Sequence, residues 1–109
     1  MVTEDQILDF LILLERLKNA YESYNGPWEG YDFNFEHIDN RIEVETGWCS
    51  PEESGEYNFT VYLEDPIRVH TKDEEYTVYG DCDNEEEDTF DSLESYGKYL
   101  IEYFNVFEN

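Results

Sequence analysis

The densest group of candidate ligands in this chain is the acidic run from Asp81 to Asp88. Its first, third and fifth residues are carboxylates that alternate like the first ligands of an EF-hand calcium loop. The sixth position of that loop requires glycine and is Glu86 here, and the twelfth requires a bidentate glutamate and is Ser92. The spacing fails at both diagnostic positions, which leaves open only weak, nonspecific binding of divalent cations.

Four other side chains have the chemistry of zinc ligands, namely His37, Cys49, His70 and Cys82, but they lack the spacing of a zinc site. Neither histidine stands in a recognisable arrangement with a serine, cysteine or carboxylate. The six glycines are scattered and do not form a phosphate-binding loop. We therefore expect neither an enzyme nor a bound cofactor or metal, and we expect both cysteines to be free thiols.

The chain of 109 residues contains 29 acidic residues and only 6 basic residues, so the number of carboxylates is informative before their arrangement is considered. The formal net charge of −23 opposes compact folding through self-repulsion. Acidic disordered chains are poor in aromatic residues, whereas this chain is 17% aromatic and 39% hydrophobic. We therefore expect a folded domain with a highly acidic surface. Adaptation to high salt gives a similar charge balance, but the richness in Tyr, Phe, Ile and Asn argues for another origin.

Two helices are expected to flank a β-rich middle. Thr3 and Gln6 fit a capping box, and apolar residues then recur at helical spacing until Asn25-Gly26-Pro27 ends the first helix. The second helix is predicted from about Thr89 or Asp91 to Phe107. Alternating apolar and polar residues predict strands at 31–36, 42–48, 57–63, 67–70 and 76–79, with a turn at 71–75 and a loop at 81–88.

These elements predict a single α+β domain over residues 1–109. An antiparallel sheet of about four to five strands, flanked on one face by an N-terminal and a C-terminal helix, buries the apolar stripes economically. The other sheet face then carries polar side chains that face solvent or a partner, namely Asp32, Asn34, Glu36, Glu43, Glu45, Asn58, Thr60 and Tyr62. Secretory and bilayer-spanning patterns are not recognised, so we expect a cytoplasmic protein without membrane contact.

The acidic residues and the tyrosines beside them form the candidate partner-binding set. Carboxylates two residues apart on a strand lie about 6.6 Å apart, so a regular strand spaces charge on the scale of polynucleotide phosphates. Exposed tyrosine is a typical interface anchor. The predicted contacts are Glu43 and Glu45 on the sheet face, Asp73, Glu74 and Glu75 in the turn, Tyr76 and Tyr79, and Asp81, Asp83, Glu85, Glu86, Glu87 and Asp88 in the loop.

In composition the whole chain resembles small, acidic, aromatic-rich DNA-mimic inhibitors encoded by phages, which include anti-restriction proteins, inhibitors of repair glycosylases and anti-CRISPR proteins. The resemblance implies occupation of the nucleic-acid site of a basic protein, with a CRISPR effector nuclease as the leading target and no direct binding of nucleic acid. Two alternatives stay open, an immunity protein that neutralises a nuclease toxin and a divalent-cation or general acidic binding module. We expect a monomer or a small homo-oligomer.

Overall fold

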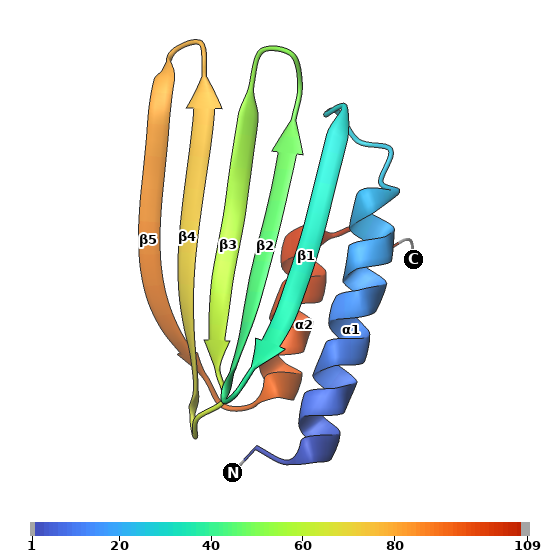
Figure 1. The fold of residues 1–109 in the computed structure, drawn as a ribbon, viewed down its shortest axis with the longest axis vertical. Helices are drawn as coiled ribbons and strands as arrows, with labels where there is room; N and C mark the ends of the chain where they lie inside the picture. Colours follow the sequence, from blue (N-terminus) through green and yellow to red (C-terminus); the bar gives the residue numbers. More distant parts are fainter. Residues whose placement is uncertain (1, 108–109) are drawn as a thin grey trace.

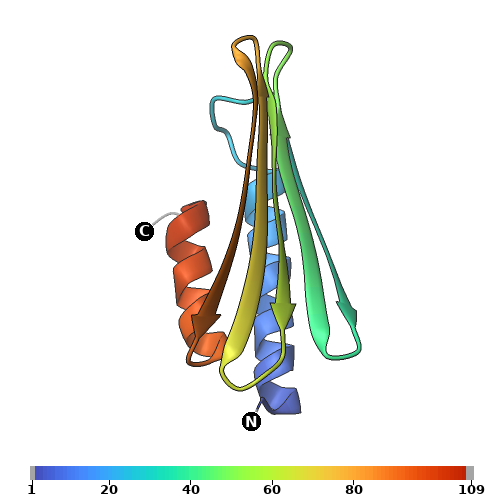
Figure 2. The same cartoon turned by 90° about the vertical axis from the view of Figure 1, so that its left-hand side faces the viewer.

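The chain folds into one antiparallel sheet with two helices packed against the same face (Figures 1 and 2). The structure is a computed structural model and describes residues 2–107. The elements are α1 (Glu4–Glu22), β1 (Gly30–Ile38), β2 (Arg41–Cys49), β3 (Ser54–Tyr62), β4 (Ile67–Thr77), β5 (Gly80–Phe90) and α2 (Leu93–Phe104). The strands pair in chain order as a five-stranded meander. The predicted α+β class, with a helix at each end of the sheet segment, is confirmed.

Helix α1 begins at the predicted capping box. The Oγ1 atom of Thr3 accepts a hydrogen bond from the backbone N of Gln6 at 3.2 Å, and the backbone N of Thr3 donates to Oε1 of Gln6 at 2.9 Å. The helix ends at Glu22, ahead of the Asn25-Gly26-Pro27 stop. Within residues 2–107, neither helix combines the length and the apolar character needed to cross a bilayer.

The core lies between the helices and the apolar face of the sheet. Its buried side chains come from both helices and from alternate positions of β1 to β4, and they are Phe10, Leu14, Leu17, Tyr21, Phe33, Ile42, Val44, Phe59, Val61, Ile67, Val69, Leu93, Tyr96 and Leu100. Gly97 allows α1 and α2 to approach closely, because a Cβ atom there would lie 2.9 Å from Cδ2 of Leu13. The packing of both helices on this face leaves the opposite face of the sheet open.

The first three strands follow the predicted pattern. The turn between β1 and β2 lies at Asp39-Asn40, where Asp39 adopts a positive φ of 52°. Val44 of β2 pairs with Phe35 of β1 and with Phe59 of β3, so the apolar positions of the three strands form one continuous row. Because the side chains of a strand alternate between faces, the same register sends the intervening polar residues to the open side.

The last two strands differ from the prediction. The predicted turn at 71–75 and the predicted loop at 81–88 are both wrong, because 71–75 lies inside β4 and 81–88 lies inside β5. The turn lies instead at residues 78–79, and Gly80 after it has a φ of 126°, which side chains disfavour. Asp and Glu have low β-propensity, so the acidic composition concealed both strands. Pairing along the whole β4–β5 ladder overrides that preference.

Helix α2 begins at Leu93, later than predicted, because β5 continues to Phe90. The Oγ atom of Ser92 caps it by accepting a hydrogen bond from the backbone N of Ser95 at 3.1 Å. The helix ends at Phe104 rather than Phe107. Figure 2 shows the strands extending past the C-terminal end of α2, so this helix covers only part of its sheet face.

Candidate partner-binding surfaces

The first candidate surface is the side of the sheet that faces away from the helices, which we call the open sheet face. The strand register places every second residue of each strand there. Its carboxylates are Asp32, Glu36, Glu43, Glu45, Glu56, Glu74, Asp81, Asp83, Glu85 and Glu87. On the central strand β3, Asn58 and Thr60 lie between the carboxylates of β1 and β2 and those of β4 and β5, whereas Glu56 of the same strand lies opposite Glu74.

The outer strand β5 carries the highest density of charge. Six carboxylates lie between Asp81 and Asp88, and at about 3.4 Å per residue this segment extends roughly 24 Å, or about 4 Å per charge. One strand of DNA carries about one phosphate per 3.4 Å of helix axis. Counted over both faces of the sheet, the strand therefore approaches the linear charge density of a nucleic-acid strand, and on the open sheet face alone the carboxylates are about 6.8 Å apart. We call Asp81, Asp83, Glu85 and Glu87, which share the open sheet face, the β5 carboxylate row.

Two basic side chains on the open sheet face are paired locally. The Nε atom of Arg41 lies 3.8 Å from Oε2 of Glu43, and Nζ of Lys72 lies 3.2 Å from Oε1 of Glu74. The hydroxyl of Tyr76 donates to Oε2 of Glu74 at 2.5 Å. Hydrogen bonds from Tyr76 and Lys72 hold the pKa of Glu74 below its ordinary value, so this carboxylate stays charged.

Arg68 is the most heavily engaged cation of the open sheet face. Its Nη1 atom lies 2.6 Å from Oε1 of Glu87, its Nε atom lies 3.3 Å from Oε2 of Glu64, and its guanidinium carbon lies 3.8 Å from the ring centre of Tyr62. The hydrogen bonds that Arg68 donates to Glu87 and Glu64 raise the pKa of its guanidinium group. Oε1 of Glu85 lies 2.9 Å from Nε2 of His70. Within the part of the chain that the structure describes, Asp81 and Asp83 form no ion pair, so two of the four carboxylates of the β5 carboxylate row are unpaired.

The structure divides the predicted site residues between the two sheet faces. Glu43, Glu45, Glu74 and Tyr76 lie on the open sheet face with the β5 carboxylate row. Asp73, Glu75, Glu86 and Asp88 occupy the alternate positions of β4 and β5, so they face the helix side. Tyr79 lies at the tip of the β4–β5 hairpin with 95% of its surface exposed. The predicted set omitted Asp32, Glu36 and Glu56, although strand alternation places them beside Glu45.

The second candidate surface is a cleft between α2 and the helix side of the sheet, which we call the tyrosine cleft. It has a volume of about 140 Å³ and is lined by Tyr57, Tyr99 and Tyr103 together with Asp73, Glu86 and Asp88. The rings of Tyr57 and Tyr103 stack with centroids 4.5 Å apart. Burial and the nearby carboxylates of Glu75 and Glu86 raise the pKa of Asp73. Burial and the charge of Asp73 also raise the pKa of Tyr103 to about 12.

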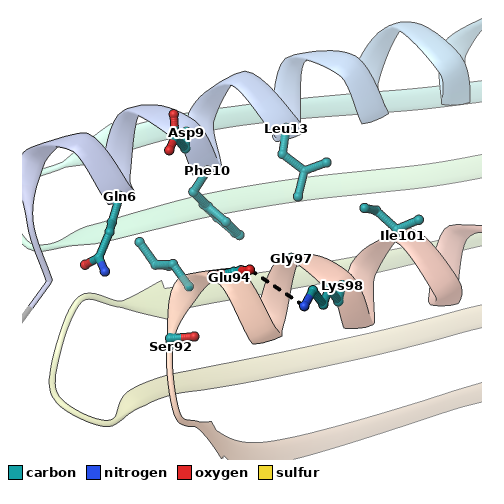
Figure 3. A pocket seen from close by; sticks show the side chains of 10 residues that line it. Gln6, Asp9, Phe10, Leu13, Ser92, Glu94, Gly97, Lys98 and Ile101 are labelled. Atoms are coloured by element: carbon teal, nitrogen blue, oxygen red, sulfur yellow. Dashed lines mark ion pairs between the residues drawn. The ribbon is translucent and has the colours of Figure 1, made fainter.

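A larger cavity of about 310 Å³ lies between α1 and α2 and contains none of the predicted site residues (Figure 3). Phe10, Leu13 and Ile101 supply apolar walls, and an ion pair of 3.6 Å joins Glu94 to Lys98 along α2. This cavity is a seam between two packed helices, and its lining is mainly apolar.

The candidate metal ligands lie far apart in the topology. His37, Cys49, His70 and Cys82 belong to four different strands, and both cysteines are exposed and unpaired. The carboxylates that alternate like an EF-hand lie in a line along β5, whereas that motif needs a loop that wraps around the ion. Within residues 2–107, no three His, Cys, Asp or Glu side chains are arranged to hold a metal ion.

No protein-family model, curated protein or solved structure matches this chain. The functional argument therefore rests on the charge, shape and burial of the two surfaces.

Proposed function

We propose that this protein is a DNA-mimic inhibitor, which binds through its open sheet face to the nucleic-acid site of a basic protein. The observation that carries the proposal is the β5 carboxylate row, in which Asp81, Asp83, Glu85 and Glu87 lie on the open sheet face. These carboxylates are about 6.8 Å apart, or about one charge for every two phosphates of a DNA strand. A CRISPR effector nuclease is the target class that we favour, which places the protein in the cytoplasm of a host cell. Direct binding of nucleic acid is not expected, because both molecules are polyanions.

The scaffold supports this role because it fixes the spacing of the charges. Strand β5 pairs with β4 over its whole length, from Phe90 opposite Ile67 to Gly80 opposite Thr77. A flexible acidic tail would lose conformational entropy when it bound a partner. Carboxylates that a paired strand already holds in a row avoid much of that loss, so more of the attraction appears as affinity.

The distribution of charge across the sheet gives further support. Glu45 on β2 lies three strands from β5, a separation of roughly 14 Å at about 4.8 Å per strand. The major groove of B-DNA is about 12 Å wide. The two acidic groups, on either side of Asn58 and Thr60, therefore have a separation similar to that of two phosphate backbones beside a groove.

The proposed mechanism is competition for a basic groove. A nucleic-acid-binding protein places Lys and Arg where phosphates lie, and its binding is strongly salt-dependent because counterions are released. A CRISPR effector has such a positively charged channel and reads a short duplex motif with arginines. The open sheet face satisfies the same cations with carboxylates, so DNA is excluded while the inhibitor is bound.

The proposal is tested by displacement of labelled duplex DNA from guide-loaded effector nucleases, followed by fluorescence anisotropy. We expect displacement at about 50 mM salt that weakens steeply toward about 200 mM, and no binding of the protein to labelled DNA alone. A panel of other basic nucleic-acid-binding proteins, including a nuclease toxin domain, sets the specificity. Unchanged DNA occupancy at low salt for every member of the panel would overturn the proposal, and inhibition of the toxin alone would indicate an immunity protein.

A further inference from the structure

The tyrosine cleft contains a buried hydroxyl without a partner. Tyr96 lines the cleft, and only 1% of its surface is exposed. Among the residues that the structure describes, its Oη atom has no hydrogen-bond partner. Buried polar groups in folded proteins are nearly always hydrogen-bonded, so an unpaired one calls for a missing partner. Burial raises the pKa of Tyr96, so the hydroxyl stays neutral and can accept a hydrogen bond.

The walls of the cleft are chemically suited to a cation. Asp73, Glu86 and Asp88 line it, and none of them forms an ion pair within residues 2–107. Tyr99 and Tyr103 also line the cleft, and these residues are 42% and 46% exposed, so the cleft is accessible from solvent. Carboxylates beside aromatic faces attract cations through both charge and the ring quadrupole.

The shape of the cleft selects among cations. A cavity of roughly 150 Å³ holds a molecule the size of benzene, and this cleft measures about 140 Å³. A guanidinium group is planar, stacks on aromatic rings and presents several N–H donors to separate acceptors. Lysine offers a compact, strongly hydrated charge that does not stack in this way. The combination of flat rings, several carboxylates and a hydroxyl acceptor therefore favours arginine over lysine.

We infer that the tyrosine cleft binds a guanidinium group, supplied by an arginine side chain of a protein partner. Tyr96 accepts one N–H at the base of the cleft, Glu86 and Asp88 accept others, and the ring of Tyr99 or Tyr103 stacks on the guanidinium plane. A peptide-borne arginine is favoured over free arginine, because the acidic surroundings repel the free carboxylate of the amino acid. This site lies on the helix side of the sheet, so it is independent of the open sheet face.

The test uses the wild-type protein labelled with ¹⁵N and four small probes, with amide chemical shifts as the readout. The probes are N-acetyl-arginine-N-methylamide, the corresponding lysine and citrulline derivatives, and free arginine. We expect the arginine derivative to bind saturably at about millimolar concentration and to shift the amides of α2 around Tyr96. The citrulline derivative, which has the same shape without the charge, is expected to bind at least about tenfold more weakly, and the lysine derivative and free arginine are also expected to bind more weakly.

Three variants separate the cleft from general acidity. Tyr96→Phe and Asp88→Asn are expected to weaken binding of the arginine derivative several-fold, whereas Glu45→Gln on the open sheet face is expected to leave it unchanged. Equal binding of the arginine and citrulline derivatives would overturn the inference, as would equal weakening by Glu45→Gln and Asp88→Asn. If Tyr96→Phe binds like the wild type, the hydroxyl has no part in recognition and the assignment is wrong. No DNA or effector is present, so failure here leaves the proposed DNA mimicry standing.

Discussion

Removal of charge from β5 is the sharpest test of the proposed inhibitor surface. The triple variant Asp81→Asn, Asp83→Asn and Glu85→Gln keeps the shape of three side chains in the β5 carboxylate row and removes their charges. The corresponding reversal replaces the same three residues with lysine. All three are exposed on an edge strand and are not part of the core, so both variants are expected to fold.

The expected magnitude follows from the exposure of these carboxylates. One exposed ion pair contributes about 0.2–1 kcal/mol, so a single neutral substitution should weaken inhibition only about twofold. Three such pairs at about 0.5 kcal/mol each amount to about 1.5 kcal/mol, or roughly a tenfold loss of affinity. In the lysine variant the reversed charges also repel the cations of the partner by a similar free energy, so the affinity is expected to fall by more than about a hundredfold. The assay is competition with labelled DNA for the effector, at low salt and at about 0.15 M salt.

A matched control decides whether the position of the charge matters. Asp9→Asn, Glu15→Gln and Glu102→Gln remove the same number of charges from exposed sites on α1 and α2. These sites lie outside the open sheet face, so we expect the control variant to inhibit like the wild type. If the control and the β5 variant lose inhibition equally, the partner responds to total charge, and the reasoning from strand geometry is refuted.

Three further predictions concern stability. Tyr96→Phe removes a buried, unpaired hydroxyl and is expected to increase the free energy of unfolding by about 1 kcal/mol in urea titrations; a decrease would show that the hydroxyl is satisfied in solution. Asp73→Asn is expected to raise Tm at pH 7, because burial and neighbouring carboxylates raise the pKa of Asp73 in the folded state. That gain should shrink as the pH falls from the folded pKa toward the unfolded pKa of about 3.9, and it should vanish well below about 3.9, where the wild-type carboxyl is protonated in both states. Burial raises the pKa of Tyr21 and Tyr103 in the folded state to about 12. Above pH about 10 these hydroxyls lose their protons in the unfolded state before they do so in the folded state. Chemical denaturation should therefore show that the free energy of unfolding falls between about pH 10 and 12.

The elements with strong local signals were predicted well from sequence. The capping box at Thr3 located the start of α1, because the interacting groups are only three residues apart. Asp39-Asn40 marked the first hairpin, because these residue types tolerate the turn conformation. Period-two alternation in β1 to β3 identified which residues face the core, because their apolar residues recur at every second position.

The elements that depend on pairing were not predicted. In β5 the residues have little intrinsic preference for a strand, and their order arises from the ladder with β4. The only local clue to the true turn was Gly80, whose positive φ is readily adopted by glycine. The loop at 81–88 was therefore predicted from the acidic composition of this segment, whereas in the structure the segment is a strand because it pairs with β4.

The sequence by itself determined the acidic surface, the aromatic core and the α+β class, because these depend on residue types and on their spacing along the chain. Only the tertiary structure decided how the acidic residues are divided between surfaces. Once β4 and β5 are extended and paired, alternate carboxylates point to opposite faces. The open sheet face then carries Asp81, Asp83 and Glu85, while the tyrosine cleft is lined by Glu86 and Asp88 together with Tyr96. Strand pairing thus divides one acidic run between two candidate surfaces.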